Sequence, residues 1–285
     1  MDFKPLGDYE ELLRSAPAGW GSGTVTHGSG GVVLDDLIAG IQRHRETATA
    51  GYWPDQEPRP VAIGCVPWLT DQSIASALAG LGGCCIVVDK QQPDYAAVRY
   101  LAEHGSSLSS VYLSAFADRG LPDQDGSPPV IGPSSGMMPP VDLGPVRVVG
   151  WRKADDGRPR PMLHAKLLVL GVATFQEDDE FGQEIFSFDP KTVWLGSANW
   201  TMAGRSHIEF GLWSTDPQLV ERTFKYLESL LTFSEPRGSS TAGPEPQLVS
   251  AVWDNEAFYE YLAEHAPDPA DGDSPDDAPD GMSPS

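Results

Sequence analysis

Cysteine, basic side chains and long apolar segments are all scarce in this chain of 285 residues. Of its three cysteines, Cys84 and Cys85 are adjacent and Cys65 lies apart, so no pair has the spacing of zinc ligands. We expect buried free thiols rather than a redox or metal site. No stretch approaches the ~18–20 unbroken apolar residues of a membrane span. The N-terminus, MDFKPLGDYEELL, carries acids where a secretory signal has basic residues and an apolar run. We therefore expect a cytoplasmic protein without a membrane partner.

Basic residues are outnumbered: 19 Lys and Arg stand against 41 Asp and Glu, for a net charge of −22. Proteins that hold nucleic acid mainly by charge usually have a basic surplus, so a polyanionic substrate needs a local basic patch here. One cluster runs into the segment before His164, and it consists of Arg147, Arg152, Lys153, Arg158 and Arg160. We predict substrate contacts from Arg152, Lys153, Arg158 and Arg160; a solvated loop is the alternative.

Strand and helix patterns alternate from Pro60 onward. VAIGCVPWL and CCIVVDK are typical of buried strands, Asp71 is a candidate N-cap for a helix through Leu81, and a second helix is expected over Tyr95–His104. Further strands are predicted at VRVVGW, LHAKLLVL, TVWLGSANW and HIEFGLWS, before a helix that starts at Pro217. This order predicts an α/β fold, with helices on the faces of a β-sheet.

Composition divides the chain into four segments. Residues 1–57 are expected to be an N-terminal extension, with helices at Asp8–Ser15 and Leu34–Arg45 joined by the glycine-rich stretch GWGSGTVTHGSGG. That stretch lacks the GxxxxGK[ST] order of a phosphate cradle, which favours a plain connector. Residues 58–235 form the candidate catalytic domain, 236–265 a C-terminal helical element and 266–285 an acidic disordered tail.

Polar residues interrupt three of the predicted strands. His164 and Lys166 lie two apart in LHAKLLVL, so both side chains leave the same face of a strand. Ser197 and Asn199 share a face in TVWLGSANW in the same way. Glu209 shares a face of HIEFGLW with His207 and Gly211. Three strands with polar residues on one side predict a single polar site on the sheet.

These residues resemble the phospholipase D superfamily, whose signature is HxKxxxxD followed by GSxN. HxK is His164-Ala165-Lys166, GSxN is Gly196–Asn199, and the trailing acid matches Glu209. The resemblance covers roughly Pro60 to Phe233. It implies a mixed β-sheet in an α-β-α sandwich, phosphodiesterase activity, and no metal or other cofactor.

The resemblance also implies a role for each residue. His164 is the nucleophile that forms a phosphohistidine intermediate. Lys166 and Asn199, with Ser197, hold the non-bridging phosphoryl oxygens. Glu209 accepts the proton on the other ring nitrogen of His164. Substrate contacts are further predicted for Gly196 and Trp200. Core packing is the alternative for Trp200 and for Trp68, and a site role for His207 is left open.

The chain departs from the family pattern at Gly171, which stands where the family has Asp. Gly171 is seven residues after His164, an odd offset that points its side chain away from the chemistry on a continuous strand. We therefore predict a lost structural contact rather than a lost catalytic group. The spacer that follows is long and acidic, TFQEDDEFGQEIFSFDP (within 174–190), and is expected to be a solvated hairpin that repels polyanions. This loop, or the acidic tail, is a candidate surface for a protein partner.

The mechanism needs two histidines, because one attacks and the other protonates the leaving group. No other histidine of this chain has a lysine two residues later. By resemblance we predict a homodimer with a shared active site, in which the two copies of His164 face each other. The predicted function is a metal-independent nuclease acting on DNA, with a role in a prokaryotic defence or DNA-modification system. The alternatives are a non-catalytic dimeric scaffold, or a phospholipid phosphodiesterase, which the negative charge disfavours.

Overall fold

The computed structural model describes residues 17–53, 57–92, 94–108, 143–152, 160–178 and 183–254, with Leu13, Glu256, Tyr259 and the short pieces 111–112, 119–121, 126–128 and 130–131. The strands are, in chain order, β1 (Ala18–Trp20), β2 (Gly23–Ser29), β3 (Arg59–Val66), β4 (Gly83–Asp89), β5 (Val111–Tyr112), β6 (Arg119–Gly120), β7 (Val130–Ile131), β8 (Val146–Val149), β9 (Leu167–Asp178), β10 (Gln183–Gly196), β11 (Ile208–Ser214), β12 (Glu235–Pro236), β13 (Val249–Ser250) and β14 (Val252–Trp253).

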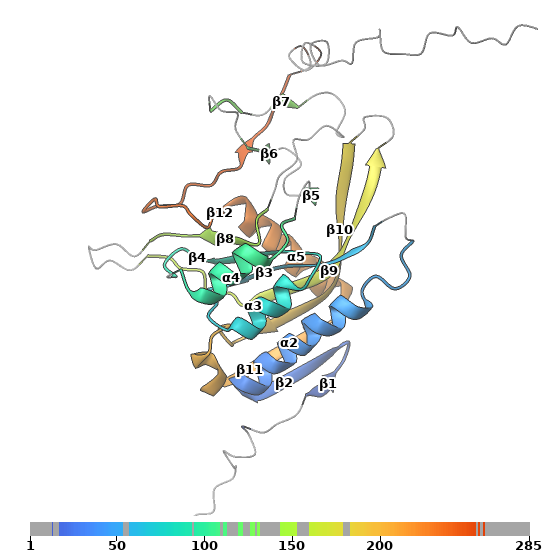
Figure 1. The fold of residues 1–285 in the computed structure, drawn as a ribbon, viewed down its shortest axis with the longest axis vertical. Coiled ribbons are helices and arrows are strands. Elements are labelled where there is room, and N and C mark those ends of the chain that lie inside the picture. Colours follow the sequence, from blue (N-terminus) through green and yellow to red (C-terminus); the bar gives the residue numbers. More distant parts are fainter. Residues whose placement is uncertain are drawn as a thin grey trace, which may run out of the picture.

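Ten of these strands form one sheet, in the order β1-β2-β11-β10-β9-β3-β4-β8-β12, with β5 paired to β10 (Figure 1). β3, β4 and β8 run parallel, whereas β3 pairs with β9 and the next strands along the sheet pair with one another in antiparallel register. The sheet is therefore mixed, and the predicted α/β class is confirmed.

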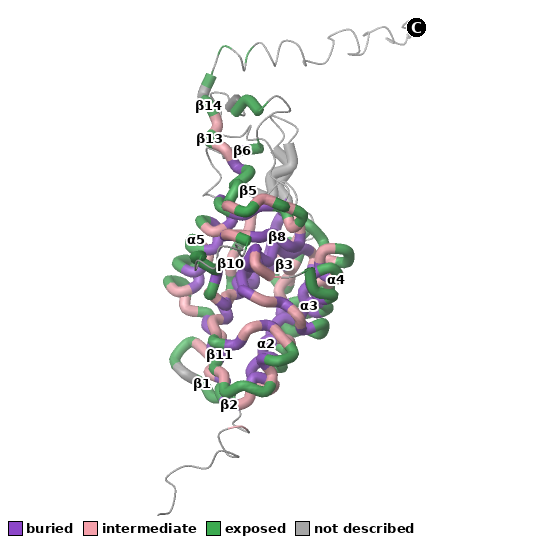
Figure 2. The backbone as a smooth tube through the Cα atoms, turned by 90° about the vertical axis from the view of Figure 1, so that its left-hand side faces the viewer, coloured by how far each residue is buried: buried purple, intermediate pink, exposed green. Residues whose placement is uncertain are grey.

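Helices cover both faces of this sheet. α2 (Gly30–Thr47), α3 (Gln72–Ala79) and α4 (Ala96–His104) pack on one face, and α5 (Pro217–Thr232) packs on the other (Figure 1). Residues of β9 alternate between the two cores: Leu168 and Leu170 face α2 and α3, whereas Val169 and Ala173 face α5. The buried residues run through the centre of the molecule (Figure 2). Among the described residues, none of the helices combines the length and the apolar character needed to cross a membrane.

Local signals placed the starts of two helices correctly, whereas α3 ends at Ala79 and not at the expected Leu81, and the helix expected over Leu34–Arg45 is the longer α2. Asp71 Oδ1 accepts hydrogen bonds from Ser73 N (2.9 Å) and Ile74 N (3.4 Å), which confirms the predicted N-cap of α3. The helix expected from Pro217 is α5, where Asp216 is the N-cap and Pro217 occupies the first turn.

The glycine-rich stretch near the N-terminus contains strand β2, most of β1 and the first residues of α2, so the predicted connector is wrong. β2 pairs with β11 over all seven of its residues, and α2 places Leu34, Leu37 and Ile41 in the core with no exposed surface. Residues 18–47 therefore share a sheet and a core with the segment that follows. The boundary expected after residue 57 does not separate two units, because the sheet and the core extend across it. The helix expected over Asp8–Ser15 lies outside the described residues, apart from Leu13.

The segment after α5 is not helical up to Asp254, whereas Glu256 and Tyr259 are helical, so the helical element expected over 236–265 is corrected for its first part. It contains β12, β13 and β14; β12 pairs with β8, β13 with β6 and β14 with β7. A buried ion pair fixes its start, because Lys90 Nζ lies 2.7 Å from Glu235 Oε2. Of the residues beyond Asp254, only Glu256 and Tyr259 are described, and the tail 266–285 lies outside.

The acidic spacer forms the expected hairpin. β9 and β10 pair from Leu167–Leu195 up to Asp178–Gln183, with a register shift between Pro190 and Thr192. The distal arms project beyond the rest of the sheet (Figure 1). Its acidic side chains from Glu177 to Glu184 lie outside the described side chains.

Candidate active site

The candidate residues meet at one edge of the sheet. Because β9 and β10 are antiparallel, the start of β9 and the end of β10 lie together, and Gly196 N donates to the carbonyl oxygen of Lys166 at 3.2 Å. His164 and Lys166 precede β9, Ser197 and Asn199 follow β10, and Glu209 is the second residue of β11. The structure thus brings the three predicted segments into one place.

His164 and Lys166 do not lie on a strand, contrary to the sequence-based expectation, because β9 begins at Leu167. The described residues directly before Leu167 are not paired with a neighbouring strand. Instead, Leu163 N donates to Oδ2 of the Asp89 side chain at 2.6 Å. The apolar residues of the segment still pack as expected, since Leu163, Ala165 and Leu167 contact the core beneath α5. An extended segment anchored by Asp89 therefore presents the two polar side chains.

The imidazole of His164 and the ammonium group of Lys166 are in direct contact. Lys166 Nζ lies 3.1 Å from Nδ1 and 3.3 Å from Nε2 of His164, and it donates to the carbonyl oxygen of His164 at 2.8 Å. His164 is exposed, whereas Lys166 is buried, at 6% exposure. An imidazole that is open to solvent thus lies beside a buried positive charge.

Burial lowers the pKa of the Lys166 ammonium group from its ordinary value, and the negative charge of Glu209 acts in the opposite direction. Desolvation disfavours the charged form of a lysine, and a nearby carboxylate favours it. Glu209 therefore helps to keep Lys166 protonated and able to hold an anionic oxygen.

Glu209 accepts a hydrogen bond from Ser197 of the same chain. Ser197 Oγ donates to Glu209 Oε2 and accepts a hydrogen bond of 3.0 Å from Phe210 N. Glu209 Oε1 also lies 3.7 Å from Nδ1 of His207, an exposed side chain. The expected bond from Glu209 to His164 is not among the contacts of the described residues. Glu209 thus orders the serine and adds negative charge near Lys166.

Asn199 lies in a tight turn that is fixed from both sides. Its carbonyl oxygen accepts from Thr201 N at 2.8 Å, and the carbonyl oxygen of Trp200 accepts from Thr70 N (2.9 Å) and Asp71 N (3.0 Å). The side-chain oxygen of Asn199, Oδ1, is buried and has no hydrogen-bond partner among the described residues. Buried polar atoms without partners are rare, and in native structures they are found at functional sites among other places.

Two predicted substrate contacts are structural instead. Trp200 is fully buried, with its ring centroid 6.3 Å from that of Trp194, because Leu69 pairs with it and draws it into the core. It cannot stack on a substrate. At Gly196, an added Cβ would lie 2.3 Å from the Trp194 ring, so this glycine is needed for packing against the indole.

The basic cluster before His164 is dispersed. Arg147 is buried and donates to Ser234 through Nε to Oγ (2.6 Å) and through its terminal nitrogen to the carbonyl oxygen (3.0 Å). Arg152 donates to the carbonyl oxygen of Ser239 at 2.6 Å and lines a cavity that is described below. Arg160 is exposed, and Lys153 and Arg158 lie outside the described residues. Of the described members of the cluster, Arg152 is the one that lines the cavity described below.

Sequence reasoning missed two residues that fix the site. Asp89 anchors the His164 segment, and its position directly after the buried strand CCIVV was a usable signal. Arg205 fixes the Asn199 turn, since its Nε lies 2.6 Å from Asp71 and a terminal nitrogen 2.7 Å from Asp35. No residue pattern near Arg205 predicts its contacts with Asp71 and Asp35. In the described part of the chain, no group of three or more His, Cys, Asp and Glu could hold a metal ion.

No protein-family model and no curated protein matches this chain. Among solved structures it is similar to NucT from Helicobacter pylori, at 15% identity and a TM-score of 0.42, over 73% of this chain and 94% of that one. It is also similar to Nuc from Salmonella typhimurium, a phospholipase D family member, at 14% identity and a TM-score of 0.41, over 77% and 97%. Phosphatidylserine synthase from Haemophilus influenzae shares 14% identity at a TM-score of 0.39, over 90% and 50%. Similarities this distant assign no activity, so function has to be read from the site.

Proposed function

We propose that this chain is a member of the phospholipase D superfamily and a phosphodiesterase that cleaves nucleic acid, with DNA as its substrate. The observation that carries the proposal is the contact between the exposed imidazole of His164 and the buried ammonium group of Lys166. A lone core histidine needs no lysine beside it. A nucleophile for a phosphate diester does, because negative charge develops on the non-bridging oxygens.

The chemistry follows from these positions. A ring nitrogen of neutral His164 attacks phosphorus, so that a P–N bond forms while the P–O bond to the leaving group breaks. Lys166 holds a non-bridging oxygen, and the side-chain NH₂ group of Asn199 is a neutral donor at the same sheet edge. Ser197 donates there only when its hydroxyl turns away from Glu209. Water then attacks the phosphorus, the P–N bond breaks, and the imidazole is restored. The leaving oxygen requires a proton, which a second imidazole must supply; that imidazole then takes a proton back from the attacking water.

We assign that second imidazole to His164 of a second copy of this chain, in a homodimer that shares one site. Large apolar side chains are exposed around the motif, as expected of a surface that a partner covers. They are Met162 (39% exposed), Met202 (61%), Ile208 (53%) and Phe210 (43%). Exposed His207, beside Glu209, is the alternative donor within the chain.

Two variants test the shared site. Phe210→Asp should give a monomer with little activity, and His207→Ala should stay dimeric and active. A strictly monomeric, active wild type would refute the shared site.

Three further predictions concern substrate selectivity, biological role and protein partners. The strongly negative net charge favours a substrate that is held at few local cations over indiscriminate binding of polyanions. A role in a prokaryotic defence or DNA-modification system stays a prediction from the resemblance. So does a protein partner at the acidic hairpin or tail.

The test compares wild type with His164→Ala on bis(p-nitrophenyl) phosphate and on labelled single- and double-stranded DNA, with EDTA present. His104→Ala is a matched control, because His104 is an exposed histidine that stacks on Tyr100 of α4. We expect loss of cleavage only in His164→Ala. Equal cleavage by all three proteins would refute the histidine mechanism. Absence of any cleavage by wild type would favour the scaffold function.

A further inference from the structure

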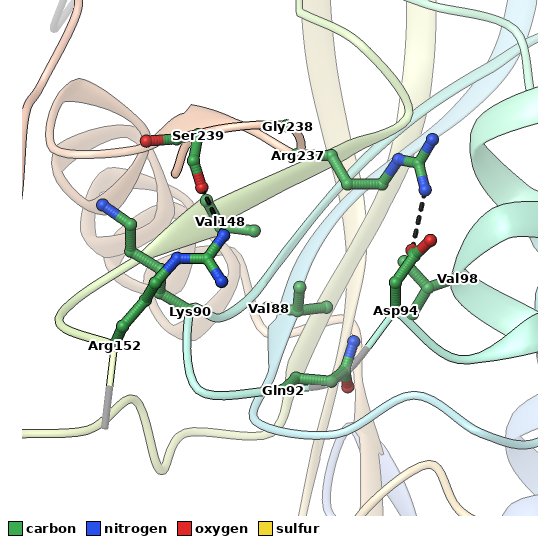
Figure 3. A pocket seen from close by; sticks show the side chains of 10 residues that line it. All are labelled: Val88, Lys90, Gln92, Asp94, Val98, Val148, Arg152, Arg237, Gly238 and Ser239. Carbon is green, nitrogen blue, oxygen red and sulfur yellow. Dashed lines mark hydrogen bonds and ion pairs between the residues drawn. The ribbon is translucent and has the colours of Figure 1, made fainter. Parts of the chain in front are cut away.

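A cavity of about 360 Å³ lies beyond the carboxyl ends of the parallel strands β4 and β8. That volume is at the lower end of the ~300–1,000 Å³ of small-molecule sites. We call it the valine pocket, because Val88, Val98 and Val148 line it and are all buried. Its polar lining consists of Lys90, Gln92, Asp94, Arg152, Arg237 and Ser239 (Figure 3).

The valine pocket is connected to the candidate active site by two hydrogen bonds. Asp89, which directly precedes pocket residue Lys90, accepts from Leu163 N at 2.6 Å, one residue before His164. On the other side, Gln92 Oε1 accepts from Leu69 N at 2.6 Å, and Leu69 pairs with Trp200, the residue after Asn199. The segments that carry the catalytic side chains are thus braced on the walls of this cavity. Asp89 and Gln92 therefore join the valine pocket to the segments of the candidate active site.

The charge of the pocket is positive and is concentrated at Arg152. Lys90 is neutralised by buried Glu235, and Arg237 is paired with Asp94 at 2.7 Å. Arg152 donates to the carbonyl oxygen of Ser239, which carries no formal charge. Figure 3 shows Arg152 on one side of the valines and the Arg237–Asp94 pair on the other. One end of the pocket thus offers an arginine to an anion, and the opposite end offers a carboxylate to donors.

The middle of the pocket suits a flat ring with polar edges. Because the oxygen of the Gln92 amide is taken by Leu69 N, its NH₂ group keeps its hydrogens for another acceptor. The valines provide an apolar surface for a ring face, while Gln92 and Asp94 offer one donor group and one acceptor group to its edge. An alkyl chain would leave the NH₂ group of Gln92 without an acceptor, whereas a polar ring edge supplies one.

We propose that the valine pocket binds one nucleotide unit of the substrate next to the scissile phosphodiester, with its base on the valines and its phosphate at Arg152. The inference rests on the proposed function, because the cavity lies beside the His164 site. It makes the enzyme selective for a diester that is flanked by a further nucleotide over a simple diester or a lipid headgroup.

Binding tests the proposal without turnover. The probe is thymidine 3′,5′-bisphosphate, which has no diester to cleave, measured by calorimetry on the full-length chain. Removal of a hydrogen bond to a charged group costs about 1.5–3 kcal/mol, so Arg152→Ala should weaken binding at least about tenfold. Arg222→Ala, an exposed arginine of α5, is the matched control and should bind as wild type does. Unchanged binding by Arg152→Ala would overturn the proposal.

A second variant fills the cavity and keeps the arginines. An added Cβ at Gly238, which lines the pocket, meets no atom within 4 Å, so Gly238→Trp should fold and exclude the base. We expect it to lose affinity for the bisphosphate and to keep wild-type affinity for inorganic phosphate. If glycerol 3-phosphate or inorganic phosphate bound wild type as tightly as the nucleotide, the base site would be refuted.

Kinetics separates this inference from the proposed function. Arg152→Ala should raise KM for a trinucleotide about tenfold more than KM for bis(p-nitrophenyl) phosphate. A wild type that hydrolyses neither substrate refutes the proposed function, whatever the calorimetry shows. A wild type that hydrolyses both, with equal changes of KM in the variant, refutes the pocket alone.

Discussion

His44 and Gly171, which lie 127 positions apart, are joined by a hydrogen bond of 2.8 Å from Nε2 of the imidazole to the carbonyl oxygen. Both residues are buried, and the bond ties α2 to β9 in the middle of the sheet. Gly171 stands where the motif has an acid, so this contact bears on how the chain works without one. A Cβ added at Gly171 would point toward Phe188 and the α5 face of the sheet, as the side chains of Val169 and Ala173 do.

Replacement of Gly171 should therefore lower stability and leave the chemistry of the folded protein intact. A Cβ there would lie 2.4 Å from the carbonyl oxygen of Asp189 and 2.7 Å from the Phe188 ring. Overpacking of this kind costs about 1–3 kcal/mol. We expect Gly171→Ala and Gly171→Asp each to lower the free energy of unfolding by that amount in urea titrations. Gly19→Ala on edge strand β1, where a Cβ meets nothing within 4 Å, is the control. A large gain of turnover in Gly171→Asp would show that the acid is catalytically required.

His44 should make the fold sensitive to acid. Burial lowers its pKa from the ordinary 6.5, and the hydrogen bond to Gly171 opposes that shift only in part. The unfolded chain then binds a proton at a higher pH than the folded chain does. Stability is thus fully present above pH 6.5 and is lost as the pH falls through the folded pKa. In His44→Gln, which keeps a donor for Gly171, the unfolding free energy should lose this dependence below pH 6.5. Exposed His104→Gln is the control, and an unchanged slope in His44→Gln would contradict the assignment.

Arg205 should be a structural support of the site. Its Nε is bonded to fully buried Asp71, whereas its second partner, Asp35, has a side chain that is 68% exposed. Hydrogen bonds to buried charges contribute about 1.5–3 kcal/mol, and exposed ion pairs about 0–1 kcal/mol. Arg205→Ala should therefore destabilise far more than Asp35→Asn in thermal unfolding. It should also reduce turnover, because the Asn199 turn loses its anchor. Equal effects of the two variants would refute the ranking.

Glu209 should control the alkaline limb of the pH–rate profile. Lys166 must be protonated to hold a phosphoryl oxygen, so activity falls as the pH rises through its pKa. Burial lowers that pKa and Glu209 raises it, hence Glu209→Gln should shift the descending limb to lower pH. Glu221→Gln, on the exposed face of α5, should leave the limb in place. An unshifted limb in Glu209→Gln would mean that another group titrates.

What the sequence predicted correctly depends on neighbours in the chain. The cap at Asp71 and the start of α5 rest on residues within one helical turn, and the alternation of Leu168, Val169 and Leu170 rests on adjacent positions. Such signals are independent of the rest of the fold. They suffice for the α/β class and for the order of the candidate motifs.

What the sequence did not predict depends on partners far along the chain. β2 is rich in glycine, which disfavours strands, and it is a strand because β11 pairs with it some 185 residues later. Arg147 was grouped with a basic loop, but Ser234 holds it in the interior. Trp200 was a candidate stacking platform until Leu69 placed it in the core. In each case a contact with a residue distant in the sequence, and not the local residue pattern, determines the structure.

The most direct test of the central claim is a search for covalent phosphate on His164 during turnover. Wild type is mixed with bis(p-nitrophenyl) phosphate in EDTA, quenched in base, digested and examined by mass spectrometry. The His164–Lys166 geometry predicts an acid-labile phosphoramidate on the peptide that contains His164, absent from His164→Ala. Steady hydrolysis by wild type with no adduct on that peptide, and an equal rate in His164→Ala, would contradict it.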